Sequence, residues 1–579
     1  MKTRIYSSLF LIFILILTSC QPKEPAEIDH PALKIVAESS QQWTGVAISE
    51  DGRIFVNFPN WSDDVPVSVA EIKDGKILPF PDKAWNKRKN KEAFQAVQSV
   101  FIDDSNHLWV LDTNNPKFKG VQPPGPHLYR FNLSGNRLAR HYSFAEDVYT
   151  EKSYFNDVRI DTQNEKAYIS DSGNGALVVL DLKTGEARRL LSEHPSVRAE
   201  TDYLMCNGYI WRNSVDADGI ALTPDGSYLY YIALSGHSLY RVSTSALNDN
   251  SLSAEQLEAK VEKVMAVPAT DGMLFDDENN LWMGGLENNA VNMLAADGTL
   301  YKMVKDSAIR WADSFAKDSA GNVYFTTSQI HLPPENRQEY TVVQLDPSKS
   351  EKKSLNKILI AITSHGLLGN TGDSTGYYLS EVSHAYYVFK DAGLQVEFTS
   401  PEGGRSPIDG YKLKDDLNRR FVNDPEAQKA ITNAIPAADI DPEKYRAIYY
   451  AGGHGTMWDF PTDGNLQHIS RSIYEQGGIV SAVCHGPAAL VELELSNGKY
   501  LVDGKTLTAF TNEEERAGQL EEVVPFLLET KLMFQGASFK EAPIYQEKVV
   551  VDGRLVTGQN PASAKGAAKE IVDLLTKDQ

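Results

Sequence analysis

The chain has few cysteines, no excess of positive charge and no long apolar segment beyond its first twenty residues. Its 579 residues contain only Cys20, Cys206 and Cys484, so no disulfide framework can stabilise the fold, which must rest on hydrophobic cores. The formal net charge of -21 disfavours a nucleic-acid partner, whose phosphates it would repel. Because 579 residues exceed what one core supports, two or three domains are expected.

The first twenty residues predict export. A positively charged start precedes a compact apolar stretch over residues 9–17, which is too short for a membrane span. The next residues, Leu17-Thr18-Ser19-Cys20, resemble a bacterial lipobox. That resemblance implies a signal peptide over 1–20, lipid modification of Cys20 and a protein anchored to a membrane of the bacterial cell envelope. The alternative is an ordinary signal peptide with an incidental cysteine. Residues 21–35 predict a tether.

One sequence pattern recurs six times between residues 36 and 347. A short apolar strand is followed by a polar turn and then by a second strand with an apolar or aromatic centre. The first strands are residues 46–48, 100–102, 158–160, 220–222, 273–275 and 315–317. Such turns between apolar strands indicate hairpins. The spacing of 42 to 62 residues leaves room for two more strands per copy, which predicts a six-bladed β-propeller.

A polar residue lies two positions before each of these first strands. The six are Thr44, Gln98, Asn156, Asp218, Asp271 and Asp313. Equivalent positions in a propeller form a ring at one end of the central channel. The ring is therefore a candidate ligand site, for which we single out Asn156, Asp218, Asp271 and Asp313. The alternative interpretation is turn chemistry, because Asp and Asn favour such positions in any case.

Residues 153–161, 167–173 and 176–185, together with 109–113, resemble the major royal jelly/yellow protein family. The resemblance implies a six-bladed propeller that binds a small ligand such as an amine, often without catalysis. A more distant similarity, to gluconolactonase/regucalcin propellers, implies a divalent metal held by a Glu, two Asn and an Asp. Thr44 stands in place of the Glu, and Asp218 replaces an Asn. A weak Ca²⁺ site in the channel is therefore chemically possible; no other cofactor is expected.

The pattern changes after a polar linker over residues 348–356. Strand-like runs lie at 358–363, 396–400, 447–451, 479–483 and 507–510, and helical segments at 377–392, 464–476, 487–495, 515–530 and 561–576. This alternation predicts a doubly wound, flavodoxin-like α/β sandwich over residues 357–579. A late hairpin, residues 549–551 and 555–557, is expected to add antiparallel strands.

The sequence around Cys484 predicts a nucleophile elbow. An apolar strand breaks at Cys484-His485-Gly486, and Pro487 suits the first position of a helix. Small neighbours allow a sharp strand-to-helix turn, and the helix N-terminus is expected to lower the pKa of the thiol. The alternative is an inert thiol that ends a core strand, which is the interpretation we give to Cys206.

Three further segments are expected near this elbow. Backbone N–H groups of Gly452-Gly453-His454-Gly455 could stabilise an oxyanion. Glu381, near the start of the first helix of this region, could approach the elbow from a sheet end, or it could be a solvated helix residue. One glutamate of 513–515 could orient His485, although three adjacent glutamates also suit a helix N-terminus.

Residues 482–487, 452–461, 504–505 and 555–561 resemble the DJ-1/PfpI superfamily, of the class I glutamine amidotransferase-like fold, and its glyoxalase III-type branch most closely. The resemblance implies a nucleophile at Cys484, an acid/base at His485 and a carboxyl at Glu381 that hydrogen-bonds the thiol. It implies Glu515 as the third member, with Glu513 as the alternative, and Gly453 and the His485 N–H as oxyanion donors.

The activity implied is the cofactor-free conversion of a small aldehyde, methylglyoxal, with water to lactate. Two alternatives stay open from the sequence. One keeps the elbow and changes the chemistry to that of a hydrolase, deglycase or amidase. The other is a non-catalytic binding or chaperone-like protein.

Overall fold

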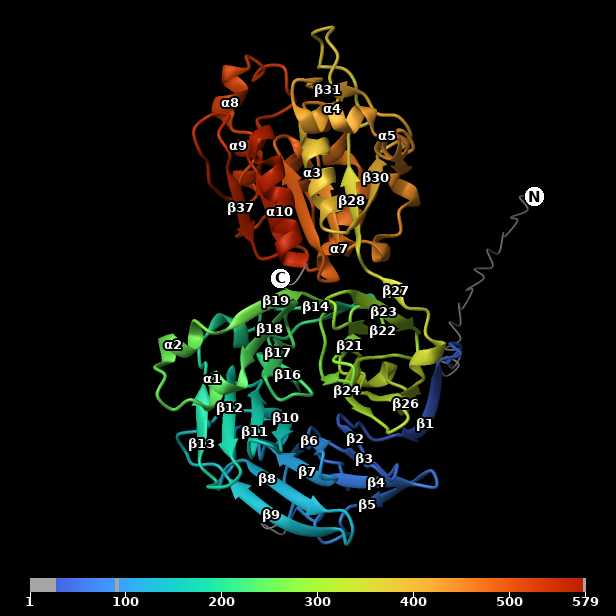
Figure 1. The fold of residues 1–579 in the computed structure, drawn as a ribbon, viewed down its shortest axis with the longest axis vertical. Coiled ribbons are helices and arrows are strands. Elements are labelled where there is room, and N and C mark those ends of the chain that lie inside the picture. Colours follow the sequence, from blue (N-terminus) through green and yellow to red (C-terminus); the bar gives the residue numbers. More distant parts are fainter. Residues whose placement is uncertain (1–27, 89–92, 576–579) are drawn as a thin grey trace, which may run out of the picture.

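The structure, a computed structural model, describes residues 28–88 and 93–575 and places two domains one above the other (Figure 1). The predicted combination of a six-bladed β-propeller and an α/β sandwich is confirmed. The predicted signal peptide, with Cys20, lies outside the described residues. Within the described part of the chain, no helix is both long enough and apolar enough to cross a membrane.

Six antiparallel sheets form the propeller, and each contains one of the hairpins predicted from the repeat. The first three blades are β2 (Val46–Ile48), β3 (Ile54–Asn57), β4 (Val69–Lys73) and β5 (Lys76–Pro79); β6 (Val97–Ile102), β7 (His107–Asp112), β8 (His127–Asn132) and β9 (Arg137–Ser143); and β10 (Phe155–Asp161), β11 (Lys166–Asp171), β12 (Ala176–Asp181) and β13 (Ala187–Leu190). The next two are β16 (Ala217–Leu222), β17 (Tyr228–Ala233), β18 (Ser238–Ser243) and β19 (Glu262–Ala266); and β20 (Met273–Phe275), β21 (Leu281–Gly285), β22 (Ala290–Leu294) and β23 (Leu300–Lys305). The last blade joins β24 (Ala312–Lys317), β25 (Val323–Thr327) and β26 (Tyr340–Leu345) to β1 (Leu33–Ser39).

The two ends of the propeller segment are tied into its sheets. β1 pairs antiparallel with β26, Leu33 opposite Leu345, so the first strand of the domain completes the last blade. Residues of the predicted linker also pair, because β27 (Lys353–Ser354) adds a strand to β23. The hairpin β14 (Leu204–Cys206) and β15 (Tyr209–Trp211) and the short helices α1 (Thr244–Asn248) and α2 (Ala254–Glu258) are insertions around the blades.

The second domain is built on a seven-stranded sheet in the order β32-β30-β28-β33-β34-β38-β37. All its strands are parallel to their neighbours except β37. Their bounds are β28 (Lys357–Ala361), β30 (Gln395–Ser400), β32 (Ile435–Pro436), β33 (Ala447–Tyr450), β34 (Ile479–Val483), β37 (Val549–Asp552) and β38 (Leu555–Gly558). The prediction of a sheet strand over 507–510 is wrong. Only Thr506–Leu507 are extended, as β35, and they pair with β36 (Ser538–Phe539) outside the main sheet.

Helices cover both faces of this sheet. Residues of α3 (Leu379–Asp391), α4 (Asp416–Asn423), α5 (Pro425–Thr432) and α10 (Ala564–Leu575) share one hydrophobic core. Residues of α7 (Gly464–Glu475) and α9 (Leu528–Phe534) share the other. Helices α4 and α5 were not predicted from the sequence, and the single helix expected over 515–530 is two short ones, α8 (Asn512–Ala517) and α9.

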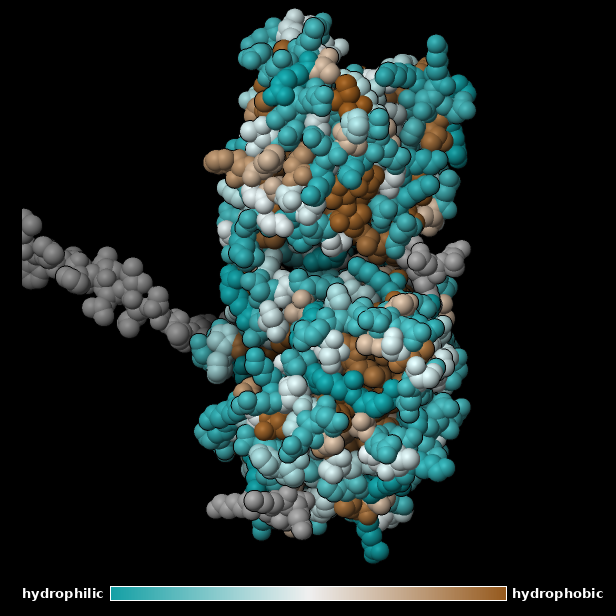
Figure 2. Space-filling view, turned by 90° about the vertical axis from the view of Figure 1, so that its left-hand side faces the viewer, coloured by the Kyte–Doolittle hydropathy of each residue, from teal (hydrophilic) through white to brown (hydrophobic). Residues whose placement is uncertain are grey.

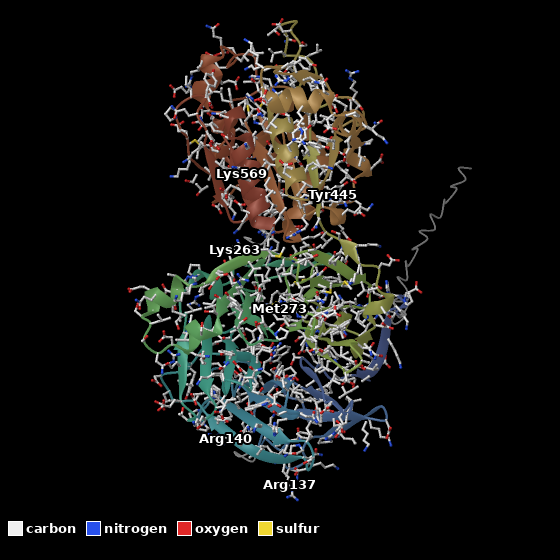
Figure 3. The ribbon with its side chains drawn as sticks, in the orientation of Figure 1. Arg137, Arg140, Lys263, Met273, Tyr445 and Lys569 are labelled. Carbon is white, nitrogen blue, oxygen red and sulfur yellow. The ribbon has the colours of Figure 1, made fainter. Side chains whose placement is uncertain are left out.

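The propeller contacts the end of the sheet at which the parallel strands begin. Arg446, just before β33, donates to Ala266 O at the end of β19 (2.6 Å) and to Leu575 O at the end of α10 (3.0 Å). The Tyr203 hydroxyl, from the propeller, donates to Glu475 at the end of α7 (3.0 Å). In Figure 3, Lys263 of β19 and Tyr445 mark the two sides of this junction. The carboxyl ends of the strands, where Cys484 follows β34, therefore face away from the propeller.

The outer surface of the two domains is mainly polar. On the face shown in Figure 2, hydrophobic side chains gather in patches on both domains between hydrophilic ones. Of the two described cysteines, Cys206 is fully buried in the propeller, as predicted, and neither it nor Cys484 forms a disulfide.

Candidate active site

The chain makes a sharp bend at Cys484. β34 is fully buried and leads directly to Cys484, whose φ of +60° is unfavourable for a residue with a side chain. Two backbone hydrogen bonds hold this conformation: the Cys484 N–H donates to Gly558 O, and Cys484 O accepts from the Phe510 N–H, both at 2.8 Å. Gly486 completes the bend, because a Cβ there would lie 2.4 Å from Tyr450 O. This geometry is that of a nucleophile elbow.

The helix after the elbow is shorter than predicted. The sequence predicts a helix over 487–495, but residues Gly486–Leu490 form a single 3-10 helix of five residues, and Val491 is extended. A helix this short aligns few peptide dipoles. The electrostatics of the Cys484 sulfur are therefore dominated by the side chains around it.

The thiol of Cys484 is almost completely buried, at 3% exposure. Burial raises its pKa, and the nearby Glu381 carboxyl raises it further when ionised. The predicted lowering of the thiol pKa is therefore wrong for the ligand-free site, because loss of hydration outweighs the short helix. His485 Nδ1 lies 3.4 Å from Sγ, close enough to accept the thiol proton as substrate arrives.

Glu381 is the second group that contacts the thiol. It lies in the first turn of α3, is fully buried, accepts the Gly452 N–H at 2.6 Å and interacts with the Cys484 thiol. Burial raises its pKa to about 8. The carboxyl is therefore mostly protonated at pH 7 and can donate a hydrogen bond to the sulfur. A neutral neighbour also avoids the charge repulsion that would oppose a thiolate.

A single carboxylate holds two imidazoles beside the sulfur. His485 Nε2 lies 2.9 Å from one oxygen of Glu515, and His454 Nε2 lies 3.1 Å from the other. The two rings are 4.1 Å apart between centroids. These contacts lower the pKa of Glu515 to about 2, so it stays ionised and accepts both N–H groups. Burial and the neighbouring His454 lower the pKa of His485.

The structure distinguishes the two glutamates that the sequence left open. Glu515 is 3% exposed and reaches His485, whereas Glu513, also in α8, is exposed. The third glutamate has a structural role: Glu514 closes a capping box with Thr511 and accepts from Asn560. Of the predicted residues, Cys484, His485, Glu515 and Glu381 therefore converge at one point.

The predicted oxyanion donors lie at the same place. Gly453 has a φ of +107°, and a Cβ there would lie 2.2 Å from Gly376 O, so only glycine fits. Its N–H donates to no acceptor in the described residues. The His485 N–H lies beside Sγ and lowers the pKa of the thiol. Both N–H groups can thus donate hydrogen bonds to a negatively charged oxygen that forms on a carbon bound to the Cys484 sulfur.

Two residues near this site were missed by sequence reasoning. His454 was used only as a spacer between glycines in the motif that supplies Gly453. Asp459 accepts from the Thr363 hydroxyl and the Ser364 N–H, both at 2.7 Å, and so fixes the loop after β28. The motif Gly452-Gly453-His454-Gly455 was the available signal for His454, because it places an imidazole next in the chain to an expected oxyanion donor.

The predicted polar ring is present at one end of the propeller channel. Gln98 donates to Asn156 at 3.1 Å, and Asn156 donates to Asp218 at 2.6 Å. Asp271 accepts from the Trp311 indole at 2.7 Å. The four predicted residues, Asn156, Asp218, Asp271 and Asp313, line a space of only about 10 Å³. Burial raises the pKa of all three aspartates, that of Asp271 to about 7.

Ca²⁺ binding at this ring stays a prediction. Among the described residues, His454, His485 and Glu515 form the one group in which three or more His, Cys, Asp or Glu ligand atoms lie within 4.8 Å of one another. The ring aspartates do not meet that spacing.

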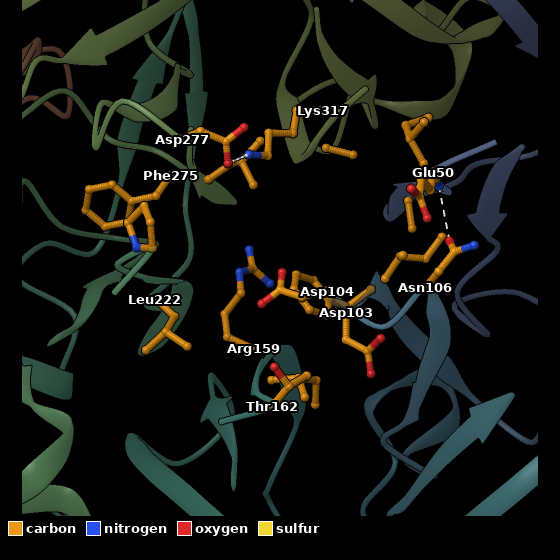
Figure 4. A pocket seen from close by; sticks show the side chains of 18 of the residues that line it. Glu50, Asp103, Asp104, Asn106, Arg159, Thr162, Leu222, Phe275, Asp277 and Lys317 are labelled. Carbon is orange, nitrogen blue, oxygen red and sulfur yellow. Dashed lines mark hydrogen bonds and ion pairs between the residues drawn. The ribbon is translucent and has the colours of Figure 1, made fainter. Parts of the chain in front are cut away.

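A larger cavity opens at the other end of the channel (Figure 4). It has a volume of about 600 Å³, and acidic and hydrophobic residues line it together, among them Glu50, Asp104, Phe101, Leu222 and Phe275. Arg159 separates it from the ring. Its guanidinium binds Asp157 and Met273 O, each at 2.7 Å, and lies over the Phe101 ring.

Comparison with known proteins agrees with this division into domains. The DJ-1/PfpI family matches residues 374–574, and the major royal jelly protein family matches residues 95–307. The probable glutathione-independent glyoxalase hsp3103 of Schizosaccharomyces pombe is 33% identical over 259 residues, which are 38% of this chain and 99% of that protein. The chain belongs to the DJ-1/PfpI family.

Other DJ-1/PfpI relatives carry the same description. The glutathione-independent glyoxalase HSP31 of Saccharomyces cerevisiae is 34% identical over 233 residues, 38% of this chain and 98% of that protein. The crystal structure of glyoxalase III from Candida albicans is 30% identical and covers 38% of this chain and 97% of its own, with a TM-score of 0.36. These curated relatives, matched over almost their full lengths, show that the α/β domain is that of a glyoxalase III-like enzyme, and the major royal jelly protein family model matches part of the propeller.

Proposed function

We propose that the α/β domain converts methylglyoxal and water to lactate without a cofactor. The observation that carries the proposal is the contact of one sulfur, Cys484, with an imidazole, His485, and a buried carboxyl, Glu381. Relatives named as glutathione-independent glyoxalases, which match this domain over almost their full lengths, support it.

In the first step, the thiol adds to the aldehyde carbon. The thiol proton passes to His485 Nδ1, and the sulfur bonds to the carbon of the aldehyde. The negative oxygen that forms is stabilised by the N–H groups of Gly453 and His485 until it takes the proton back. Glu381, protonated at pH 7, stabilises the transient thiolate by hydrogen bonding.

In the second step, His485 moves a proton between two neighbouring carbons. It removes the hydrogen from the carbon bound to sulfur and returns a proton to the adjacent carbon, through an enediolate. The hydroxyl proton passes from the first oxygen to the second. The product is a lactoyl thioester of Cys484, which water hydrolyses to lactate. Glu515 keeps His485 in the tautomer that has Nδ1 free to accept a proton.

The test is the formation of D-lactate from methylglyoxal by the full-length protein. Cys484→Ala should abolish it, and Cys206→Ala, which changes a thiol buried in the propeller, should retain it. Equal rates in wild type and Cys484→Ala would refute the proposal. Turnover of acyl or glycated substrates in its place would assign the same elbow to a hydrolase, deglycase or amidase. Slow thiol alkylation that does not change with pH would favour a binding or chaperone-like role.

We further propose that the propeller binds a small ligand. The cavity of about 600 Å³, with its mixed acidic and hydrophobic lining, supports this proposal better than the narrow ring does. For the ring, titration calorimetry with Ca²⁺ is decisive, with Asp271→Asn as the control. No heat at millimolar Ca²⁺ would exclude a cation there.

We also propose that the protein is exported and anchored by a lipid on Cys20, on the evidence of the lipobox-like sequence alone. Radiolabelled palmitate should label the wild type in a bacterial host and should not label Cys20→Ser. Equal labelling of both would contradict the anchor.

A further inference from the structure

The second imidazole of the site, His454, has no part in the two steps described above. Its side chain is 21% exposed, whereas those of His485 and Glu515 are 1% and 4% exposed. The carboxylate of Glu515 thus separates a sealed imidazole that contacts sulfur from one that solvent can reach. Water that enters the site therefore meets His454 before it meets His485.

The hydrogen bonds also fix which nitrogens can act. Glu515 is ionised and accepts from Nε2 of both rings, so each neutral imidazole carries its proton on Nε2 and has Nδ1 free. His485 Nδ1 faces the sulfur at 3.4 Å. His454 Nδ1 has no hydrogen-bond partner within the described residues. It is a free proton acceptor next to the elbow.

We infer that His454 is the general base that activates water to hydrolyse the thioester on Cys484. This inference rests on the proposed function, because it assigns a base to its last step. The two imidazoles then have different roles: His485 accepts the thiol proton and transfers a proton between the two carbons, and His454 accepts a proton from the attacking water. One carboxylate, that of Glu515, orients both imidazoles.

Hydrolysis of the thioester consumes one water molecule and regenerates the free thiol. The water oxygen bonds to the thioester carbon while one water proton passes to His454 Nδ1. The carbon–sulfur bond then breaks, and its electron pair stays on Sγ. The carboxylic acid that forms returns a proton to the sulfur, and His454 loses its proton to solvent. Lactate, a proton and the free thiol result.

The division of labour predicts a particular defect in His454→Asn. Formation of the acyl-enzyme should change little, while its hydrolysis should slow by about 100-fold, the usual contribution of a general base. Methylglyoxal should therefore give a burst of one acyl group per site, followed by slow turnover. Hydroxylamine, a nucleophile that needs no base, should release the group as a hydroxamate and restore turnover. His468→Asn, at an exposed histidine of α7, should behave as wild type.

Rapid-quench kinetics with mass spectrometry of the intact protein distinguish the outcomes. If His454→Asn and His454→Gln slow acyl formation and hydrolysis equally, His454 only positions His485 and the inference is overturned. Turnover of both variants at the wild-type rate would overturn it too. If the wild type makes no lactate, the proposed function fails and the inference fails with it. If the wild type makes lactate but the His454 variants give no burst, the inference alone fails.

Discussion

Substitution of Glu381 by Gln should make the protein more stable and less active. Glu381 is fully buried, and its pKa is raised from 4.5 to about 8. When an acid has a higher pKa in the folded state than in the unfolded state, the free energy of unfolding falls as pH rises from the unfolded pKa to the folded pKa. The cost begins near pH 4.5 and is complete above pH 8. At about 1.4 kcal/mol per pKa unit, it reaches about 3 kcal/mol at pH 7.

Gln preserves the shape and the acceptor for the Gly452 N–H, and it cannot ionise. The free energy of unfolding of Glu381→Gln should therefore exceed that of wild type by an amount that grows by about 3 kcal/mol from pH 5 to pH 8. Urea unfolding at the two pH values measures it, with Glu513→Gln, at an exposed glutamate of α8, as the control. Differences that stay constant with pH would show that Glu381 is ionised throughout and would refute the argument.

Three further predictions concern two residues of the active site and one residue of the domain junction. Glu515→Gln should lower kcat at least 100-fold because it loses the charge that orients two imidazoles, while the exposed Glu513→Gln should not; equal effects would mean that the wrong glutamate has been assigned. The pKa of His485 is lowered from 6.5, so the acid limb of kcat/KM, which needs a neutral imidazole, should lie below pH 6.5, and a limb above that value would contradict the assignment. Arg446→Met removes the donor to two buried carbonyls and should lower the free energy of unfolding by about 3 kcal/mol, with faster proteolysis of residues 348–356. The exposed Arg419→Met should change neither property. An unchanged urea midpoint for Arg446→Met would show that this contact between the domains contributes nothing to stability.

Local signals in the sequence predict much of the fold. Each blade hairpin depends on contacts between residues close in the chain, so the turn between its strands is sufficient to locate it. The elbow is equally local, because Gly486 and the strand before Cys484 are adjacent to the nucleophile. Pairings between distant segments were missed: β1 joins β26 some three hundred residues later, and the polar residues Lys353–Ser354 pair as a strand only because β23 offers a free edge.

The electrostatics of the site could not be predicted from the sequence. The pKa of the thiol depends on burial, which overturns the effect expected from the helix start, and on Glu381, which lies about one hundred residues away in the chain. His454 carried a visible signal in its motif, but its contact with Glu515 depends on the packing of α8, some sixty residues later in the chain, beside it. Sequence patterns thus located the reacting atoms, while their protonation required the packed structure.

The account depends most on the sulfur of Cys484 carrying the chemistry. The most direct measurement follows inactivation by iodoacetamide while peptide mass spectrometry counts alkylation at Cys484 and Cys206. The account predicts that lactate formation falls in proportion to alkylation of Cys484, that methylglyoxal protects this thiol, and that Cys206 stays unmodified. Full alkylation of Cys484 with undiminished lactate formation would contradict it.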